Sequence, residues 1–343
     1  MGIKNQRYSA FRKMIFIVFT RIGDVHASHI QSILALQNHE LVILERENYG
    51  KSWNISSLEN DEIQIFIQVE DRIISHHDIS AIWHRVNFTV EKISFPELSE
   101  SENSYVAAQR SIHVNSALRA LSDLVPCMNS PLANWNAQSK TLQAVRAKSV
   151  GLRIPRGFRG GSPPLARNFL TYDSSIRICS KPLEAVHLDY DGAKFAKMTR
   201  IVDYNETMER IDTLADCPLI LQEYVQKEYE LRVTIVGNEI FSCAIDASRA
   251  NSESQMDWRN YDLANTPHWV QELPIEVAKK LLDLHKSFNL VYGAYDLIKT
   301  SADEYYFLEV NSMGQWLWIE DLTDLPISNA VAVALIYLAN GKI

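Results

Sequence analysis

Two apolar segments near the C-terminal end of the chain carry acidic residues at positions that a β-hairpin would bring together. The segments VYGAYDLIK and EYYFLEVN flank the turn-like stretch TSADE, an arrangement typical of two antiparallel strands. If Thr300 lies opposite Tyr305, then Asp296 lies directly opposite Glu309. Like charges that face each other destabilise a sheet, so the pattern requires a compensating cation at this place.

The same strand adds a third oxygen ligand. Residues two apart on a strand point to the same side, so Asn311 should lie beside Glu309. Two carboxylates and one amide oxygen form an all-oxygen set with few ligands, which suits Mg²⁺ carried with nucleotide phosphates. A proton shared between Asp296 and Glu309, or a different hairpin register, remains the alternative.

The composition places the chain among globular proteins of two or three domains. It has 343 residues, of which 46% are hydrophobic and 22% charged. The net charge of −8, without a basic run that includes aromatic residues, argues against a nucleic-acid partner.

The longest apolar segment, 330–339, is too short to cross a membrane. The four cysteines lack the C-x-x-C spacing of zinc sites and suit a reducing cytoplasm.

The N-terminal part has the pattern of a parallel βαβ unit. The apolar runs 14–19 and 41–45 flank a segment with helical spacing, and AIWHRV (81–86) extends the expected sheet. Trp83 and Arg85 share one face of that strand; an amphipathic edge strand is favoured there over a substrate contact.

Helical spacing follows over 105–124 and again over about 138–150, and the polar stretch SPLANWNAQSK is expected to connect the two helices. We therefore expect four parts, which are an N-terminal arm (1–13), an N-terminal domain (14–128), a central subdomain (129–225) and a C-terminal subdomain (226–343).

One lysine and one arginine stand at apolar positions. Lys181 ends the run IRICSK, where it is either an edge-strand lysine or a ligand for phosphate. Arg232 lies within the strand pattern ELRVTIV, and a buried guanidinium requires an anion, either a phosphate, which we favour, or a neighbouring Glu.

A polar crossover precedes Arg232. The stretch Glu223 to Val225 ends one apolar strand, and its exposed backbone groups could read the edge of a flat base. Glu230, seven residues beyond Glu223, could accept hydrogen bonds from a ribose. A hairpin follows, for which Gly237 and Asn238 suit a two-residue turn.

Taken together, these elements resemble the ATP-grasp ligases in order and spacing from about 130 to 320. The elements are Lys140, Lys181, QEYV with Glu230, ELRV, and Asp296 with Glu309-x-Asn311. Within that superfamily, QEYVQKEYELRVTIVG, MDWR (256–259) and NSMGQWLWIEDLTDLPIS look like the microviridin-type peptide macrocyclases, the graspetide synthetases. Two departures are Ser312, where such ligases usually have Pro, and Ser139, where an acidic residue is common.

The resemblance implies an α/β protein with the ATP-grasp fold, in which an N-terminal βαβ domain precedes a central lid subdomain and a C-terminal subdomain with an antiparallel sheet. It implies roles for three groups of residues. Nucleotide would be held by Lys140, Lys181, Gln222, Glu223, Tyr224, Val225 and Glu230. Magnesium would be held by Asp296, Glu309 and Asn311. Arg232 and Lys181 would be the catalytic cations.

Two further segments would contact the peptide by the same resemblance. The stretch 188–200 would be a lid hairpin or a platform for a leader peptide, and an ordinary solvated hairpin is the alternative. Asp257 and Arg259 would position the core peptide, or would simply form an internal salt bridge. The residues that would meet leader or substrate are Asp189, Asp191, Arg200, Asp257 and Arg259.

The implied activity is ATP-dependent macrocyclisation of a ribosomal precursor peptide, composed of leader and core. ATP would convert an Asp or Glu side chain into an acyl phosphate, which a Ser or Thr hydroxyl or a Lys amine of the same peptide then attacks. One alternative is a ligase that adds a free amino acid, and another is a silent nucleotide- or peptide-binding module. Homodimers are common among such ligases.

Overall fold

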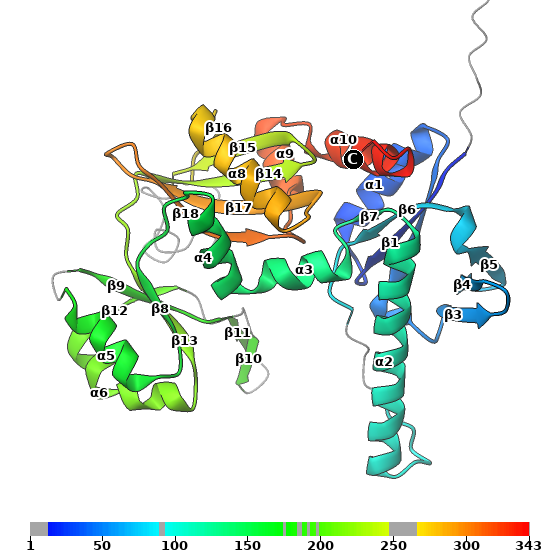
Figure 1. Cartoon of the computed structure of the whole chain (residues 1–343), viewed down its shortest axis with the longest axis horizontal. Helices are drawn as coiled ribbons and strands as arrows, with labels where there is room; N and C mark the ends of the chain where they lie inside the picture. The colour runs from blue at the N-terminus through cyan, green and yellow to red at the C-terminus, as the bar shows by residue number, and fades with distance from the viewer. Residues whose placement is uncertain are drawn as a thin grey trace, which may run out of the picture. The chain divides into compact units, whose positions relative to one another are not determined.

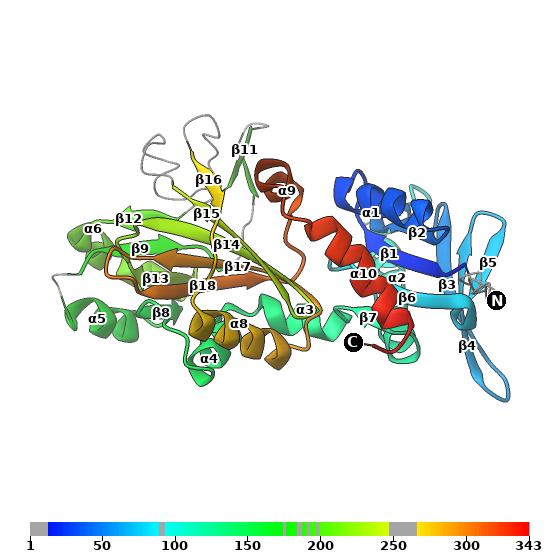
Figure 2. The ribbon, with the colours of Figure 1, turned by 90° about the horizontal axis from the view of Figure 1, so that it is seen from above.

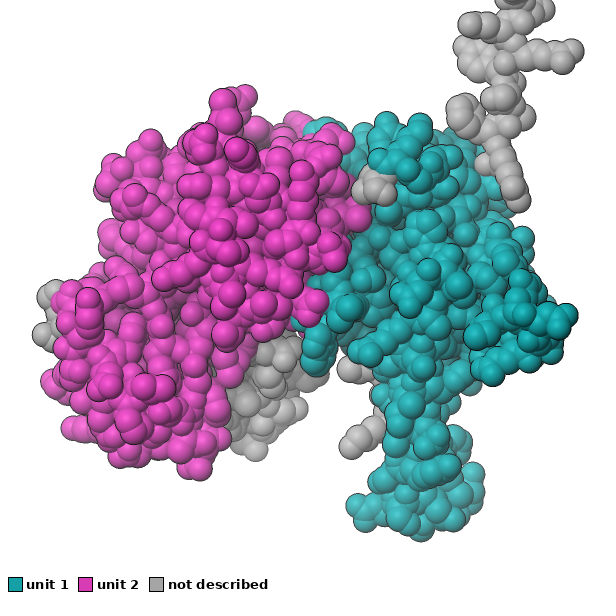
Figure 3. Space-filling view, viewed as in Figure 1, with its two compact units in different colours: residues 1–135, 326–343 teal, residues 136–325 magenta. Residues whose placement is uncertain are grey.

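A computed structural model describes most of the chain, and its residues form two compact units (Figure 3). The described residues are 13–88, 93–173, 176–183, 187–190, 193–196, 199–246 and 266–342, with the backbone alone in 187–190 and 193–196. Unit 1 comprises 1–135 and 326–343, and unit 2 comprises 136–325. The last helix therefore belongs with the N-terminal part of the chain, whereas the sequence placed it in a C-terminal subdomain.

Unit 1 is built on a parallel sheet with the strand order β2-β1-β6-β7 (Figure 1). The predicted βαβ opening is confirmed, because β1 pairs in parallel with β2 on one side and β6 on the other. A small antiparallel sheet of β3, β4 and β5 is inserted between β2 and β6. The elements are β1 (Ile15–Thr20), α1 (Val25–Leu36), β2 (Glu40–Glu45), β3 (Trp53–Glu59), β4 (Ile63–Val69), β5 (Arg72–Ser75), β6 (Ile79–His84), α2 (Glu100–Leu124), β7 (Cys127–Met128), α3 (Pro131–Gln138) and α10 (Ile327–Ala339).

Alternating side chains of β1 bury both faces of this sheet. Ile17 and Phe19 join a hydrophobic cluster with Val114 and Leu118 of α2, so α2 covers one face. Helix α10 contacts β6, β7 and α1. Its buried residue Leu335 is one of several at helical spacing, as the sequence predicts.

Two expectations for unit 1 were wrong. The edge-strand interpretation of Trp83 and Arg85 fails because β6 lies inside the sheet and both side chains are buried. Arg85 instead forms an ion pair with the buried Asp24, with 3.1 Å between Nε and Oδ2. The polar stretch that was expected to be a connection forms helix α3, because Pro131 starts a helix well and Ala133 and Ala137 supply buried positions.

The described part of unit 2 contains two larger antiparallel sheets (Figure 2) and a separate two-stranded antiparallel sheet of β10 and β11. The smaller has the order β12-β9-β13-β8, and the larger has the order β16-β15-β14-β17-β18, with α8 and α4 against it. The elements are α4 (Lys140–Ser149), β8 (Gly157–Gly160), α5 (Pro163–Thr171), β9 (Ile178–Lys181), β10 (His187–Tyr190), β11 (Ala193–Ala196), β12 (Arg200–Val202), α6 (Tyr204–Glu209), β13 (Leu219–Glu223), β14 (Tyr229–Val236), β15 (Glu239–Ile245), β16 (His268–Val270), α8 (Ile275–Ser287), β17 (Tyr292–Lys299), β18 (Tyr305–Asn311) and α9 (Leu317–Thr323).

The hairpin of β17 and β18 reaches the predicted pairing through an irregularity. Next to the turn, Tyr305 lies opposite Lys299, one residue away from the predicted partner Thr300. The register then shifts between Leu297 and Asp296, and from that bulge onward Asp296 lies opposite Glu309, as predicted. The bulge thus restores the pairing that the sequence predicted from an incorrect turn register.

No helix in the described part of the chain is long and apolar enough to cross a membrane. Segment 330–339, the longest apolar run of the sequence, lies within α10 and packs in unit 1.

We expect Leu335→Ala to destabilise unit 1 by about 2–5 kcal/mol, because the fully buried side chain leaves a cavity between α10 and the sheet. Urea unfolding followed by circular dichroism would measure the change. Tyr337→Ala on the exposed side of α10 is the control, with an expected effect within about 0.5 kcal/mol. Equal effects of the two substitutions would contradict the packing of this helix.

Candidate active site

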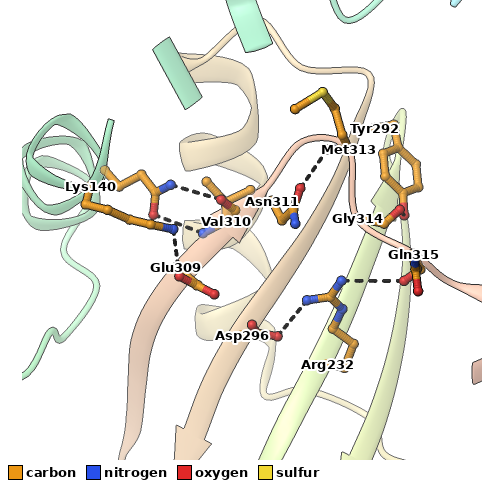
Figure 4. Close-up of polar contacts among 11 residues, drawn as sticks. Lys140, Arg232, Tyr292, Asp296, Glu309, Val310, Asn311, Met313, Gly314 and Gln315 are labelled. Carbon is orange, nitrogen blue, oxygen red and sulfur yellow. Dashed lines mark hydrogen bonds and ion pairs between the residues drawn. The ribbon is translucent and has the colours of Figure 1, made fainter. Parts of the chain in front are cut away.

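A row of three charged side chains crosses the larger sheet of unit 2. Arg232 on β14 lies opposite Asp296 on β17, which in turn lies opposite Glu309 on β18. Arg232 donates a hydrogen bond from Nη1 to Oδ1 of Asp296 over 2.8 Å (Figure 4). Burial disfavours the charge of Arg232, but the attraction of Asp296 outweighs it and raises the pKa of the guanidinium. The anion that Arg232 requires is thus an aspartate of the next strand.

The second carboxylate of the row has its own cation. Lys140, the first residue of α4, donates from Nζ to Oε2 of Glu309 over 2.6 Å (Figure 4). The side chain of Ser139 caps the helix by accepting a hydrogen bond from the backbone N–H of Leu142. Lys140 and Arg232 therefore supply a cationic partner for each of the two facing carboxylates.

The chain turns sharply after β18 and is held by hydrogen bonds to its backbone. The Oδ1 atom of Asn311 accepts from the backbone N–H of Met313 over 3.0 Å. The hydroxyl of the buried Tyr292 donates to the carbonyl of Gly314 over 2.9 Å (Figure 4). These bonds fix the path of the loop immediately after the predicted metal ligands.

The position of Gly314 requires a residue without a side chain, because neighbouring atoms approach its Cα closely. A Cβ atom there would lie 2.6 Å from Cβ of Ala294 and 2.7 Å from Nη2 of Arg232. Nη2 also donates to the carbonyl of Gln315 over 3.4 Å. The absence of a side chain at Gly314 therefore lets the loop lie directly against the guanidinium.

A pocket that opens to solvent lies between the smaller and the larger sheet of unit 2 and brings most of the predicted nucleotide residues together. Eight predicted residues line the pocket, and these are Lys181, Gln222, Glu223, Tyr224, Val225, Glu230, Asp296 and Glu309. Lys140 and Arg232 do not line it but contact Glu309 and Asp296, which do.

Lys181 lies on an inner strand, so the edge-strand interpretation is wrong. Its strand β9 is flanked by β12 and β13 within the smaller sheet. The ammonium group of a lysine at the end of such a strand needs polar surroundings. Lys181 finds them in the pocket, which its side chain lines.

Lys227 lines the pocket but is not among the predicted site residues. Its Nζ atom lies 2.7 Å from Oε1 of Glu230, and both side chains are largely buried in the wall of the pocket. Lys227 and Glu230 are three residues apart in a segment that is not helical. Their spacing in the sequence therefore does not indicate an ion pair. Glu223 is held too, because its Oε2 atom accepts from the backbone N–H of Arg156 over 3.3 Å.

The predicted peptide-contacting residues are only partly described. Asp191, Asp257 and Arg259 lie outside the described residues. The predicted hairpin in 188–200 is present as β10 and β11, in which Asp189 lies opposite Lys194 in backbone register. Arg200 is exposed at the start of β12. A role in peptide binding stays a prediction for all of them.

The two tryptophans after Gly314 do not line the pocket. Trp316 is fully buried and packs against Tyr292, with 5.3 Å between ring centroids. Trp318 and His268 form a T-shaped pair, with 5.7 Å between ring centroids. Trp316 therefore belongs to the core of unit 2.

No group of three or more His, Cys, Asp or Glu side chains gathers at one place in the described segments. The donor set in the row contains two such residues, Asp296 and Glu309, next to the amide of Asn311. A site with few protein oxygens fits an ion that keeps several waters and is shared with phosphates, as Mg²⁺ does.

No protein-family model matches the chain, and no curated protein matches its sequence. Solved structures match over nearly the whole length. One is a RiPP-associated ATP-grasp ligase of Chryseobacterium gregarium in complex with ADP and a leader and core peptide, with 23% identity, a TM-score of 0.85, and coverage of 94% of this chain and 96% of that one. Another is the macrocyclase MdnC of Microcystis aeruginosa bound with the precursor peptide MdnA, with 23% identity, a TM-score of 0.81, and coverage of 94% and 99%.

A third match is the ATP-grasp ligase PsnB, complexed with a variant of its minimal precursor, Mg and ADP. It has 18% identity, a TM-score of 0.72, and coverage of 95% of this chain and 99% of that one. At such identities the likeness establishes the fold.

We expect Gly314→Ala to destabilise the protein by about 1–3 kcal/mol, because the new methyl group overlaps Ala294 and the guanidinium of Arg232. Chemical unfolding would measure the loss. A Gly314→Ala protein of unchanged stability would show that the loop moves away from Arg232 at no cost, contrary to the packing described.

Proposed function

Because the chain has the ATP-grasp fold, we propose that it is an ATP-dependent ligase that activates carboxylates of a peptide. The observation that supports this most directly is the row of Arg232, Asp296 and Glu309 beside a pocket lined by the predicted nucleotide residues. Positioned cations, and carboxylates that could hold a metal ion beside a pocket, are parts that phosphoryl transfer uses.

The nucleotide would lie in the pocket with its base against the crossover at Glu223 to Val225 and its ribose at Glu230. Lys181 and Lys140 would meet the phosphates. Asp296, Glu309 and Asn311 would hold Mg²⁺, which neutralises phosphate charge when it is bound. Solved structures of this fold that contain ADP, or Mg and ADP, support the binding of a nucleotide and a metal ion.

The chemistry follows from the weakness of a carboxylate as an electrophile. Transfer of the terminal phosphoryl group to a carboxylate oxygen forms an acyl phosphate and releases ADP. Charge spreads over the equatorial oxygens during this transfer, and the protein contributes by positioning and by cations. Arg232 is positioned for that role because its guanidinium is fixed by Asp296 and by the carbonyl of Gln315.

We propose a ribosomal precursor peptide as the substrate, since two of the matching structures contain a leader and core peptide or a precursor peptide. A Ser or Thr hydroxyl, or a Lys amine, of the same peptide attacks the acyl carbon, loses its proton and expels phosphate. The product is an ester or amide between two side chains, one water lighter than the precursor. A homodimer and a cytoplasmic location stay predictions.

The intact mass of a Thr-, Ser-, Asp- and Glu-rich precursor peptide, encoded beside the gene, tests the proposal. Incubation with the protein, Mg²⁺ and ATP should remove whole water masses, and omission of ATP should abolish the loss. A mass gain would support the alternative of a ligase that adds a free amino acid. An unchanged mass, without peptide-dependent ADP release, would contradict a ligase and support a silent binding module.

We expect Arg232→Ala to slow turnover by roughly 10²- to 10³-fold, the loss typical of one donor to a transition state. The rate of ADP release and the affinity for nucleotide would be measured together. Because the substitution leaves Asp296 buried without its guanidinium, the stability of the variant is measured first. A folded variant with near-normal turnover and nucleotide affinity would exclude the role of Arg232.

A further inference from the structure

The side chain of Gln143 binds the backbone of β18 between the two predicted metal ligands of that strand. Its Nε2 atom donates to the carbonyl of Val310 over 2.9 Å, and its Oε1 atom accepts from the N–H of Val310 over 3.1 Å. The other hydrogen of Nε2 goes to the carbonyl of Ala137 over 2.5 Å. Gln143 is 1% exposed, so these three bonds are made in the protein interior.

The edge position of β18 explains why the contact is available. β18 is the last strand of its sheet, and its outer edge forms one isolated bridge, between Tyr306 and Arg153. Its outer edge presents N–H and C=O groups that need partners when buried. The carbonyl of Arg153 accepts from the N–H of Phe307, and the amide of Gln143 serves Val310 further along the strand.

Helix α4 thus binds β18 at two consecutive residues. Positions three apart lie on one face of a helix, so Lys140 and Gln143 point together toward the strand. Lys140 binds the side chain of Glu309, while Gln143 holds the peptide group of the next residue, Val310. The first contact is an ion pair, whereas the second joins two neutral groups.

We propose that Gln143 is a positioning residue for the metal site, an inference that rests on the function proposed above. It fixes the backbone of Val310, and thereby the directions in which Glu309 and Asn311 leave the strand. A two-point contact of this kind resists both sliding and twisting of the strand, since each movement lengthens at least one hydrogen bond. Outer contacts of this type commonly tune metal affinity by 10- to 100-fold.

Binding of Mn²⁺, used as a probe in place of Mg²⁺, tests the proposal without turnover. The free ion is counted by electron paramagnetic resonance during titration of the protein in the presence of saturating ADP. Gln143→Met keeps the length of the side chain and its preference for helix but makes none of the three hydrogen bonds. We expect its dissociation constant for Mn²⁺ to rise about 10- to 100-fold.

Two further variants separate positioning from loss of stability. Ala147→Gly lowers helix stability one turn further along the same buried face and leaves the contact with Val310 intact. We expect it to lower the unfolding midpoint while the Mn²⁺ dissociation constant stays unchanged. Gln143→Asn keeps the amide but is one methylene too short to reach Val310, so it should weaken Mn²⁺ binding even if Gln143→Met fails to fold.

Unchanged Mn²⁺ affinity in a folded Gln143 variant would overturn the positioning role alone. The same conclusion would follow if Ala147→Gly, at equal loss of stability, weakened Mn²⁺ binding as much. Absence of Mn²⁺ binding by the unaltered protein with ADP would overturn the proposed metal site as well, which makes the two failures distinguishable.

Discussion

The buried ion pair of Arg232 and Asp296 is the interaction on which the site depends. A guanidinium inside a sheet loses most of its hydration, and only a close carboxylate with well-directed hydrogen bonds offsets that loss. The pair in turn restricts its surroundings. Gly314 must lack a side chain because the guanidinium lies beside it, and the carbonyl of Gln315 must face Nη2. The shape of the loop after β18 is therefore a consequence of the charge at Arg232.

The charges could be located from sequence because they break an apolar pattern. A strand rich in Val, Leu and Ile tolerates Arg232, Asp296 or Glu309 only when a partner faces it, so each exception predicts a neighbour. The facing pair of Asp296 and Glu309 was found in this way. The turn register was predicted wrongly, yet the bulge beside Asp296 restored the pairing. A bulge adds one residue to one strand, and the local pattern of side chains does not predict where it occurs.

Features that depend on tertiary contacts were beyond the reach of the sequence. The partner of Arg85 is Asp24, which lies far away along the chain, and an alternating pattern describes inner and edge strands equally well. Helix α3 was read as a connection because its residues are polar, although two small residues suffice to pack it. Gln143 was missed for a related reason, since an isolated glutamine on a helix gives no sign that it will bind a strand edge.

The balance of charge in the row bears on how the proposed nucleotide and metal ion would bind. Two cations, Lys140 and Arg232, already neutralise Asp296 and Glu309. A metal cation that bound these carboxylates without phosphate would lie close to the two positive charges of Lys140 and Arg232. Such repulsion is unfavourable in a poorly hydrated site. If phosphates arrive with the ion, the lysine and the guanidinium gain new anionic partners while the carboxylates turn to the metal. Each charge then exchanges one partner for another, so binding of nucleotide and metal together avoids a buried charge without a counterion.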